Sequence, residues 1–483
     1  MRSVQTLSGW IGYHRGMTYT DLAGLAVSTT SSDALSAYER GVDLFLRWRT
    51  GAMEALDAAA TSDPRFALAA CTGAYIAWRM GRVDLADAAA QHAVTLAEAA
   101  HHERERLHVH AVDALRRGDS ANAYQVLERI AAEYPTDRMA VRLVGLNCIT
   151  QGDYRRGIDL ARRSLEASPD EPQYLTMLGF FLEQSGYNDE GLATSLRSLA
   201  RDPTNLYTYH AVGHAYQARG DYRNTLETFE RAASLERYAH VLWHLAEAHA
   251  ILGEARMTRD YWASTTPPLP LYERIELLWR LEVVHHTPTD EAIWRDLARQ
   301  GERVLQHADF LTTWMHHWIG VAFARVGDWD RARQQLERLR RLPEGRPSGY
   351  WSTLGVALLE GEMAIIQGDD ASAVQLMAPG VERIDTMGGG SREQKDIFRD
   401  VFLELHRRLG HVEQVISLAQ ARLLANPYHL QSIAALVWAY ARNGDAALQR
   451  QACRQLVLRA QEVGCAPDAP EVLAARKVLE VSA

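Results

Sequence analysis

The chain has 483 residues, with 52 Lys and Arg against 61 Asp and Glu and a formal net charge of −9. This acidic balance argues against nucleic acid as a partner, because phosphate binding needs a basic surface. No stretch of about 18 apolar residues predicts a membrane span, and residues 1–10 lack the layout of a signal peptide. We therefore expect a cytoplasmic protein with no membrane partner.

The cysteines favour the same compartment. There are four of them, and none forms a CxxC pair, which argues for free thiols rather than a thiolate metal site. Their positions are Cys71, Cys148, Cys453 and Cys465.

In chain order, residues 1–35 are expected to form an extension that packs on the first repeats, and residues 36–264 to form a first repeat array. Turn glycines in this array recur every 34 residues, the tetratricopeptide period: Gly118, Gly152, Gly186 and Gly220. A second set of glycines lies seven residues before three of these turns: Gly145, Gly179 and Gly213.

A physical role follows for each glycine. The earlier glycine lets the two helices of a hairpin pack closely, and the later one ends the first helix. Prolines that lie 17 residues after a turn glycine start the next repeat, where a missing N–H costs little: Pro135, Pro169 and Pro203.

The period breaks at residues 265–270, where the sequence TTPPLP cannot continue a helix. We expect an irregular helical linker over 265–308, with helices near 271–284 and 289–306, and a second array over 309–483. A plain loop is the favoured interpretation of the break, with a hinge or a pocket wall as the alternative. The fold class is all-α, an α-α superhelix (TPR-like solenoid) of about ten helical hairpins, with a closed or ring-like curl as one arrangement.

Several segments resemble one known family, and they keep the family's motif order over residues 20–440. They are GLAVSTTSSDALSAYERGVDLFLRW (24–48), RERLHVHAVDALRRGD (104–119), HAVGHAYQARGDY (210–222), HVLWHLAEAHAILGE (240–254), LLWRLE (277–282) and MGGGSREQKDIF (387–398). The chain in these segments resembles the tetratricopeptide repeat protein 38 family. The resemblance implies a repeat fold and recurrent histidines, but no established reaction.

In such hairpins the first helix lines the concave groove through positions 2, 5, 9 and 12 of the repeat. This frame gives a lining of histidine, carboxylate and aromatic side chains, with Arg142 as the clear basic residue of the N-terminal half. The predicted ligand-binding residues are Tyr207, Phe180, Glu183, His240, Trp243, Trp314, His317, Arg142, Asp400 and Glu404.

His210 and His214 are four residues apart and share one helix face, as two ligands of one divalent metal would. A third ligand would come from His240, His244 or Glu247. Acid–base chemistry is an alternative, with His210, His214, His244 and Glu247 as the catalytic candidates. Simple packing of these histidines is another. We expect no obligatory cofactor, with a divalent metal on His210 and His214 left open.

Two C-terminal segments each have a functional and a plainer structural interpretation. In the segment 314–318, Trp314 is expected to form a groove wall, while Trp318 fills the core. Glycines 388–390 precede a helix, where an anion could bind, but Ser391 and Gln394 favour a capping box.

Three functions remain open at this point. The first is a solenoid that binds a small molecule or a peptide or protein segment in its groove. The second is an enzyme that uses the histidine and glutamate cluster, and the third is a homo-oligomeric protein-protein scaffold. Whether the protein is an enzyme is left undecided, because fold does not imply function.

Overall fold

The computed structural model describes residues 19–264, 266, 268–305 and 313–481. Most of the predicted N-terminal extension, the segment 1–10, and Thr265 and Pro267 of the TTPPLP break lie outside the described residues. The chain divides into two compact units, one of Met1–Phe45 and Thr50–Ala140 and the other of Leu46–Arg49 and Val141–Ala483.

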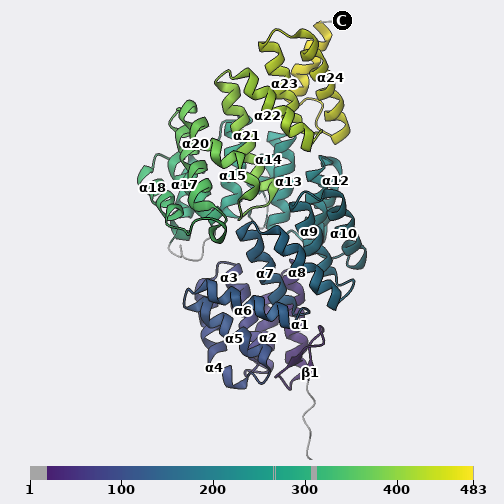
Figure 1. The fold of residues 1–483 in the computed structure, drawn as a ribbon, viewed down its shortest axis with the longest axis vertical. Coiled ribbons are helices and arrows are strands. Elements are labelled where there is room, and N and C mark those ends of the chain that lie inside the picture. Colours follow the sequence, from purple (N-terminus) through teal and green to yellow (C-terminus); the bar gives the residue numbers. More distant parts are fainter. Residues whose placement is uncertain (1–18, 265, 267, 306–312, 482–483) are drawn as a thin grey trace, which may run out of the picture. The chain divides into compact units, whose positions relative to one another are not determined.

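The first unit holds a short antiparallel pair of strands and the first helices (Figure 1). Its elements are β1 (Tyr19–Thr20), β2 (Ala26–Val27), α1 (Ser32–Leu46), α2 (Ala52–Ser62), α3 (Ala67–Arg79), α4 (Val83–Thr95), η1 (Ala97–Ala99), α5 (Glu103–Arg116) and α6 (Ser120–Glu133).

Apart from the short segment Leu46–Arg49, the second unit begins within α7 and continues as successive helices. The helices up to the predicted linker are α7 (Arg138–Gln151), α8 (Tyr154–Ala167), α9 (Pro172–Gln184), α10 (Asn188–Arg201), α11 (Leu206–Ala218), α12 (Tyr222–Leu235), α13 (Ala239–Ile251) and α14 (Ala255–Ser264). The remaining elements are α15 (Leu271–Val283), α16 (Glu291–Val304), α17 (Thr313–Arg325), α18 (Trp329–Arg340), η3 (Arg346–Ser348), η4 (Trp351–Gly355), α19 (Val356–Ile366), α20 (Asp370–Glu382), η5 (Ile384–Thr386), α21 (Arg392–Arg408), α22 (Val412–Ala425), α23 (Leu430–Arg442), α24 (Ala446–Val463) and α25 (Pro470–Val481).

Consecutive helices pack as hairpins, such as α9 with α10 and α11 with α12 (Figure 1). The all-α, TPR-like solenoid predicted from the 34-residue period is therefore confirmed. Helices α15 and α16 also follow the predicted break. The boundaries of the two arrays remain predictions.

The recurrent turn glycine, which in several repeats is followed by Asp, explains how the hairpins turn. Gly152 adopts φ 66°, in the left-handed region that ends a helix. The next residue, Asp153, accepts a hydrogen bond from the backbone N–H of Arg156 and so caps α8. The earlier glycine of the repeat has its predicted role as well. A Cβ on Gly213 would meet the Phe229 ring at 2.3 Å, so α11 and α12 approach closely only with glycine there.

The first unit contains a buried polar network on α5. His108 contacts Asp137 through Nε2 at 3.0 Å and Tyr75 through Nδ1 at 3.3 Å. Arg104 donates to the same carboxylate of Asp137 at 2.9 Å and pairs with Asp21 at 3.0 Å. Burial raises the pKa of Asp137, but His108 and Arg104 outweigh it and hold that pKa below its usual range.

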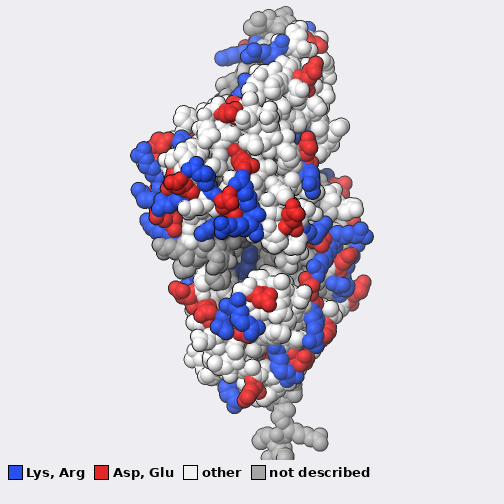
Figure 2. Space-filling model, turned by 60° about the vertical axis from the view of Figure 1, so that its left-hand side comes forward, with Lys and Arg blue, Asp and Glu red and all other residues white. Residues whose placement is uncertain are grey.

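Charges of both signs are interspersed on the face shown in Figure 2. A basic cluster of Arg338, Arg340, Arg341 and Arg346 begins at the C-terminal turn of α18, where Arg340 pairs with Glu337 and Glu360. The Arg340 side chain is 42% exposed, so this cluster is a solvated helix end. None of the described helices is both long and apolar enough to cross a bilayer.

Candidate metal and ligand site

Four histidines from two neighbouring first helices meet inside the second unit. His210 and His214 lie one turn apart on α11, and their Nε2 atoms are 2.9 Å apart. Helix α13 contributes His244, whose Nε2 lies 3.1 Å from that of His214, and His240, whose Nε2 lies 3.2 Å from that of His210. The predicted pairing of His210 with His214 on one face is therefore observed, and the next repeat completes a cluster of four imidazoles, called here the histidine cluster.

The outer nitrogens of three of the four histidines face glutamates, whereas Nδ1 of His210 has no hydrogen-bond partner within the described structure. His214 Nδ1 lies 2.6 Å from the Glu393 carboxylate on α21, and His240 Nδ1 lies 2.6 Å from Glu273 on α15. A carboxylate oxygen of Glu247 lies 3.4 Å from His244 Nδ1. A carboxylate at Nδ1 holds the proton there and leaves the Nε2 lone pair free.

The Nε2 atoms therefore face one another with too few protons between them. A proton on His210 Nε2 can be donated to His214 or to His240, but not to both, because each N–H makes one strong hydrogen bond. Burial, followed by the neighbouring histidines, lowers the pKa of His210 and of His244. Neutral imidazoles whose lone pairs converge form a set of metal ligands.

The spacing suits a tetrahedral ion. Zinc–imidazole bonds of about 2.0–2.1 Å in a tetrahedron place neighbouring nitrogens about 3.3 Å apart. The three Nε2 separations of 2.9, 3.1 and 3.2 Å are slightly shorter than that value. Among the described residues, His210, His240 and His244 also have ligand atoms that all lie within 4.8 Å of one another.

A carboxylate pair borders the cluster beside His214. Gln184 donates through Nε2 to Glu183 at 2.7 Å and to Glu393 at 3.1 Å. Burial and the nearby Glu393 raise the pKa of Glu183 well above its usual range. Burial also raises the pKa of Glu393, but His214 and Arg392 outweigh it and lower that pKa to about 2. Glu183, His214 and Glu393 form a second group with metal-ligating spacing.

Aromatic rings surround the histidine cluster, and one side is accessible. The His240 side chain is 22% exposed, whereas those of His214 and His244 are 1% and 0% exposed. The Trp48 ring lies over this side, 4.6 Å from the His210 ring and 5.6 Å from the His240 ring. Trp48 has φ 58°, which is uncommon for a residue with a large side chain. Backbone strain of this kind is often found at functional sites.

Several residues predicted to bind ligand lie around the histidine cluster. Phe180 lies 5.7 Å from the His210 ring, and Tyr207 lies 6.1 Å from it. Trp243 is stacked on His240, with ring centroids 5.5 Å apart. Arg142 places its guanidinium 4.0 Å above the Tyr207 ring.

Other predicted residues lie elsewhere in the second unit. Trp314 and His317 contact Trp351 and Phe398 in a buried aromatic cluster, where His317 Nε2 also lies 2.7 Å from Glu362. Asp400 forms ion pairs with Arg280 and Arg422. In both places the side chains are held by packing or by opposite charges.

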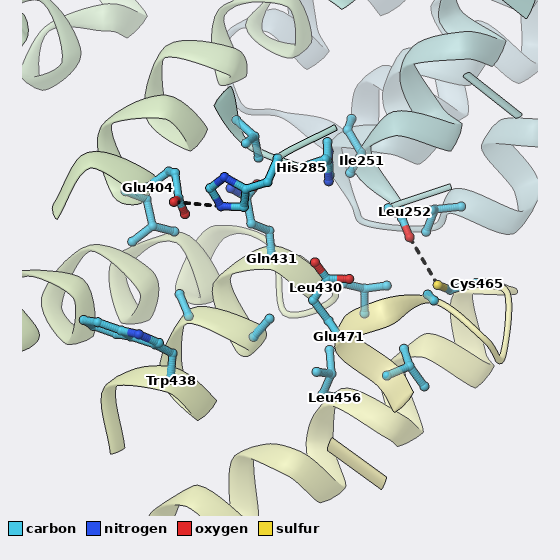
Figure 3. Close-up of a pocket in the computed structure, with 18 of the residues that line it drawn as sticks. Ile251, Leu252, His285, Glu404, Leu430, Gln431, Trp438, Leu456, Cys465 and Glu471 are labelled. Atoms are coloured by element: carbon cyan, nitrogen blue, oxygen red, sulfur yellow. Dashed lines mark hydrogen bonds and ion pairs between the residues drawn. The ribbon is translucent and has the colours of Figure 1, made fainter. Parts of the chain in front are cut away.

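Glu404 lies at the wall of a separate cavity of about 150 Å³ (Figure 3). It pairs there with His286 at 3.0 Å and with Arg407 at 2.6 Å. The other labelled walls include Leu430 and Trp438, so this cavity is mainly apolar with a charged edge.

The predicted anion loop before α21 is capped by its own sequence. Ser391 and Gln394 form a capping box, as expected. Downstream, Lys395 is buried and donates to Tyr154 Oη at 3.1 Å and to the Met387 carbonyl at 2.8 Å. Burial lowers the pKa of Lys395 to about 8.

Three residues of the site were not predicted, namely Glu273, Glu393 and Trp48. Glu273 lies 33 residues after His240, about one repeat later, so the period held a signal for it. Glu393 is 179 residues from His214 along the chain. It lies in a segment that carries the family resemblance, but that resemblance does not indicate a contact with His214. Trp48 precedes the clear repeats, and no pattern in the sequence places it beside His210.

No family model matches the chain. Among curated proteins, it is 27% identical over 108 residues to the BBSome complex member bbs-4 of Caenorhabditis elegans, covering 22% of this chain and 23% of that protein. It is 26% identical over 102 residues to BBSome complex member BBS4 of Bos taurus, covering 21% of this chain and 20% of that protein. The matched segment thus spans less than a quarter of these relatives.

Solved structures with a similar backbone fold include repeat proteins. A human IFIT1 dimer with m7Gppp-AAAA matches with a TM-score of 0.43 at 13% identity, covering 82% of this chain and 90% of that chain. The APC/C hetero-tetramer Cut9-Hcn1 matches with a TM-score of 0.44 at 14% identity, covering 92% and 75%. A tetratricopeptide repeat protein from Parabacteroides merdae matches with a TM-score of 0.28 at 12% identity, covering 62% and 98%.

Proposed function

We propose that this solenoid holds a divalent metal ion of the zinc class on its histidine cluster and presents it to a ligand in the groove. The observation that carries the proposal is the convergence of four Nε2 atoms, with successive separations of 2.9, 3.1 and 3.2 Å. Imidazole ligands suit zinc, copper, nickel and iron, and the near-tetrahedral spacing favours zinc.

The surrounding carboxylates support the same function. Glu393 and Glu273 accept from the Nδ1–H groups of His214 and His240, which orients each ring and raises its basicity toward a metal. His240 is the most accessible of the four imidazoles, so an incoming ligand meets the metal at that side.

Metal analysis of the purified full chain, grown with added zinc, tests the proposal. We expect about one equivalent of zinc in the unaltered protein and loss of that metal in His210→Gln and His244→Gln. The matched control is His249→Gln on the same helix, because His249 is buried and paired with Glu254 at 2.6 Å, outside the cluster. Failure of the unaltered protein to bind zinc, or retention of zinc by both cluster variants, would contradict it.

A second candidate is acid–base catalysis without a metal. The observation that favours it is the contact of 2.6 Å between His214 Nδ1 and Glu393, the arrangement in which a carboxylate orients a general-base histidine. Metal analysis separates the two candidates. A protein that never binds zinc, but has a turnover that depends on His214, would favour the second.

Membership of the tetratricopeptide repeat protein 38 family and a cytoplasmic location are also proposals. The ordered motifs over residues 20–440 support the first. The second is supported by Cys71, Cys453 and Cys465, which are buried thiols and form no disulfide within the described structure.

A further inference from the structure

A buried arginine near the histidine cluster has no acidic partner among the described residues. Arg142 on α7 is only 4% exposed, and its guanidinium contacts the face of the Tyr207 ring, 4.0 Å from the ring centroid. The other deeply buried arginines behave differently, since Arg104 pairs with Asp137 and Arg280 pairs with Asp400. A buried charge is expensive unless an opposite charge offsets it.

Two more side chains of the concave face have polar atoms without partners. Within the described structure, Tyr207 Oη has no hydrogen-bond partner, and neither amide atom of Gln173 has one. Both residues are nine-tenths or more buried, with exposures of 2% and 3%. They occupy equivalent positions of successive repeats, 34 residues apart on α9 and α11.

These three side chains share one chemistry. A guanidinium, an amide NH₂ and a phenol O–H are all hydrogen-bond donors, and together they suit the oxygens of an anion. Unpartnered buried donors are rare in native proteins, and each one requires an explanation such as a ligand. Contact with an aromatic face satisfies part of the Arg142 charge, but it supplies no acceptor for its N–H groups.

Two of these donor residues, Arg142 and Tyr207, lie next to the histidine cluster. Arg142 lies over Tyr207, and the Tyr207 ring lies 24° from parallel with that of His210. Phe180, on the same face of α9 as Gln173, contacts the rings of His210 and His214. A molecule held by these donors therefore has the metal ligands as its neighbours.

We propose that Arg142, Tyr207 and Gln173 form a subsite for the oxyanion group, carboxylate or phosphate, of a small-molecule ligand. The inference rests on the proposed function, because it names the class of ligand that reaches the metal-holding histidines. The proposed ligand is an organic anion. It enters past Trp48 and His240 and places its charged end on Arg142.

Isothermal titration of the zinc-loaded full chain with succinate and with inorganic phosphate, at matched ionic strength, tests the subsite. We expect one of the two to bind, and the tighter one identifies the oxyanion. Arg142→Gln should weaken that binding at least about tenfold, since it removes a charge-assisted hydrogen-bond donor. Tyr207→Phe, which removes only the hydroxyl, should weaken it by a smaller factor.

The control is Arg219→Gln, because Arg219 is an exposed arginine next to α11 that pairs with Asp189 at 3.0 Å. Its anion binding should equal that of the unaltered protein. If Arg142→Gln does not fold by circular dichroism, Tyr207→Phe carries the test. The subsite would be overturned if neither anion binds. It would also be overturned if the Arg142 and Tyr207 variants bind the anion as tightly as the unaltered protein does.

The test of the anion subsite can fail independently of the test of metal binding. Zinc bound at one equivalent with no Arg142-dependent anion overturns the subsite alone. If the unaltered protein takes up no zinc but binds an anion in a way that depends on Arg142, the metal proposal is overturned and the subsite stands.

Discussion

Buried histidines occur in both units, but in two different settings. In the first unit, each ring nitrogen of His108 meets an oxygen, from Asp137 or from Tyr75, and Arg104 supplies the charge that the carboxylate needs. In the second unit, His210 and His214 meet other ring nitrogens at their Nε2 atoms. Burial is common to both settings, so burial alone does not distinguish a structural histidine from a ligand.

The two settings differ in the atoms that face each histidine ring nitrogen. A ring nitrogen that faces an oxygen completes a hydrogen bond and stabilises the fold. Converging ring nitrogens leave lone pairs opposed, and only a cation satisfies all of them at once. We therefore assign the network of His108 to stability and the histidine cluster to metal binding. The following predictions separate the two assignments.

The largest expected effect is on the first unit. Asp137→Asn leaves the Arg104 guanidinium buried without its main counter-charge, and we expect a loss of about 3–5 kcal/mol in the free energy of unfolding. Chemical denaturation followed by circular dichroism measures it. Zinc content should stay unchanged in the folded variant, and a loss of zinc there would contradict the separation of roles.

The next largest effect is the stabilisation of the second unit by bound zinc. At free zinc 100 times its Kd, we expect about 2.7 kcal/mol of added stability, because the ion binds the folded cluster and not the unfolded chain. Thermal unfolding with and without a zinc chelator measures this gain. His249→Gln should retain the gain, and a gain that persists in His210→Gln would place the metal elsewhere.

A smaller effect is expected from the glutamate behind a ligand. Glu393→Gln should weaken zinc binding by about 10–100-fold, since it removes the carboxylate that orients His214. Competition with a chromogenic chelator measures the affinity. Glu254→Gln is the matched control, because Glu254 makes the same 2.6 Å contact to a histidine, His249, outside the cluster. Equal affinities in the two variants would count against a role for Glu393.

The smallest effect is a pH dependence in the first unit. The folded-state pKa of Asp137 is lowered, so its contribution to stability is present above the unfolded pKa of about 3.9 and is lost as pH falls below it. Between pH 7 and pH 5, the difference in unfolding free energy between the unaltered protein and Asp137→Asn should change by less than about 0.1 kcal/mol. It should then shrink toward pH 3.5, and a change already at pH 6 would indicate another titrating group.

The sequence predicted the fold well because the signals are local. Gly152 and Asp153 end one helix and start the next, and the turn glycine recurs with the repeat period. The same period predicted that His210, His214, His240 and His244 occupy first helices of neighbouring repeats. For these residues, spacing along one helix and between adjacent repeats determines proximity.

The rest of the site depends on long-range packing, which no spacing encodes. Glu393 reaches His214 from α21, and Trp48 reaches His210 from a segment before the clear repeats. The same repeat frame also selected Trp314 and Asp400, which lie in a buried aromatic cluster and an ion-pair network. A position on the first helix of a repeat therefore does not by itself place a residue at the histidine cluster.

The most direct test of the central claim is anomalous diffraction at the zinc edge from crystals of the zinc-loaded protein. We predict one strong peak about 2.0–2.1 Å from the Nε2 atoms of His210, His214, His240 and His244. A peak at another site, or none at the histidine cluster despite bound zinc, would contradict the assignment of these residues as metal ligands.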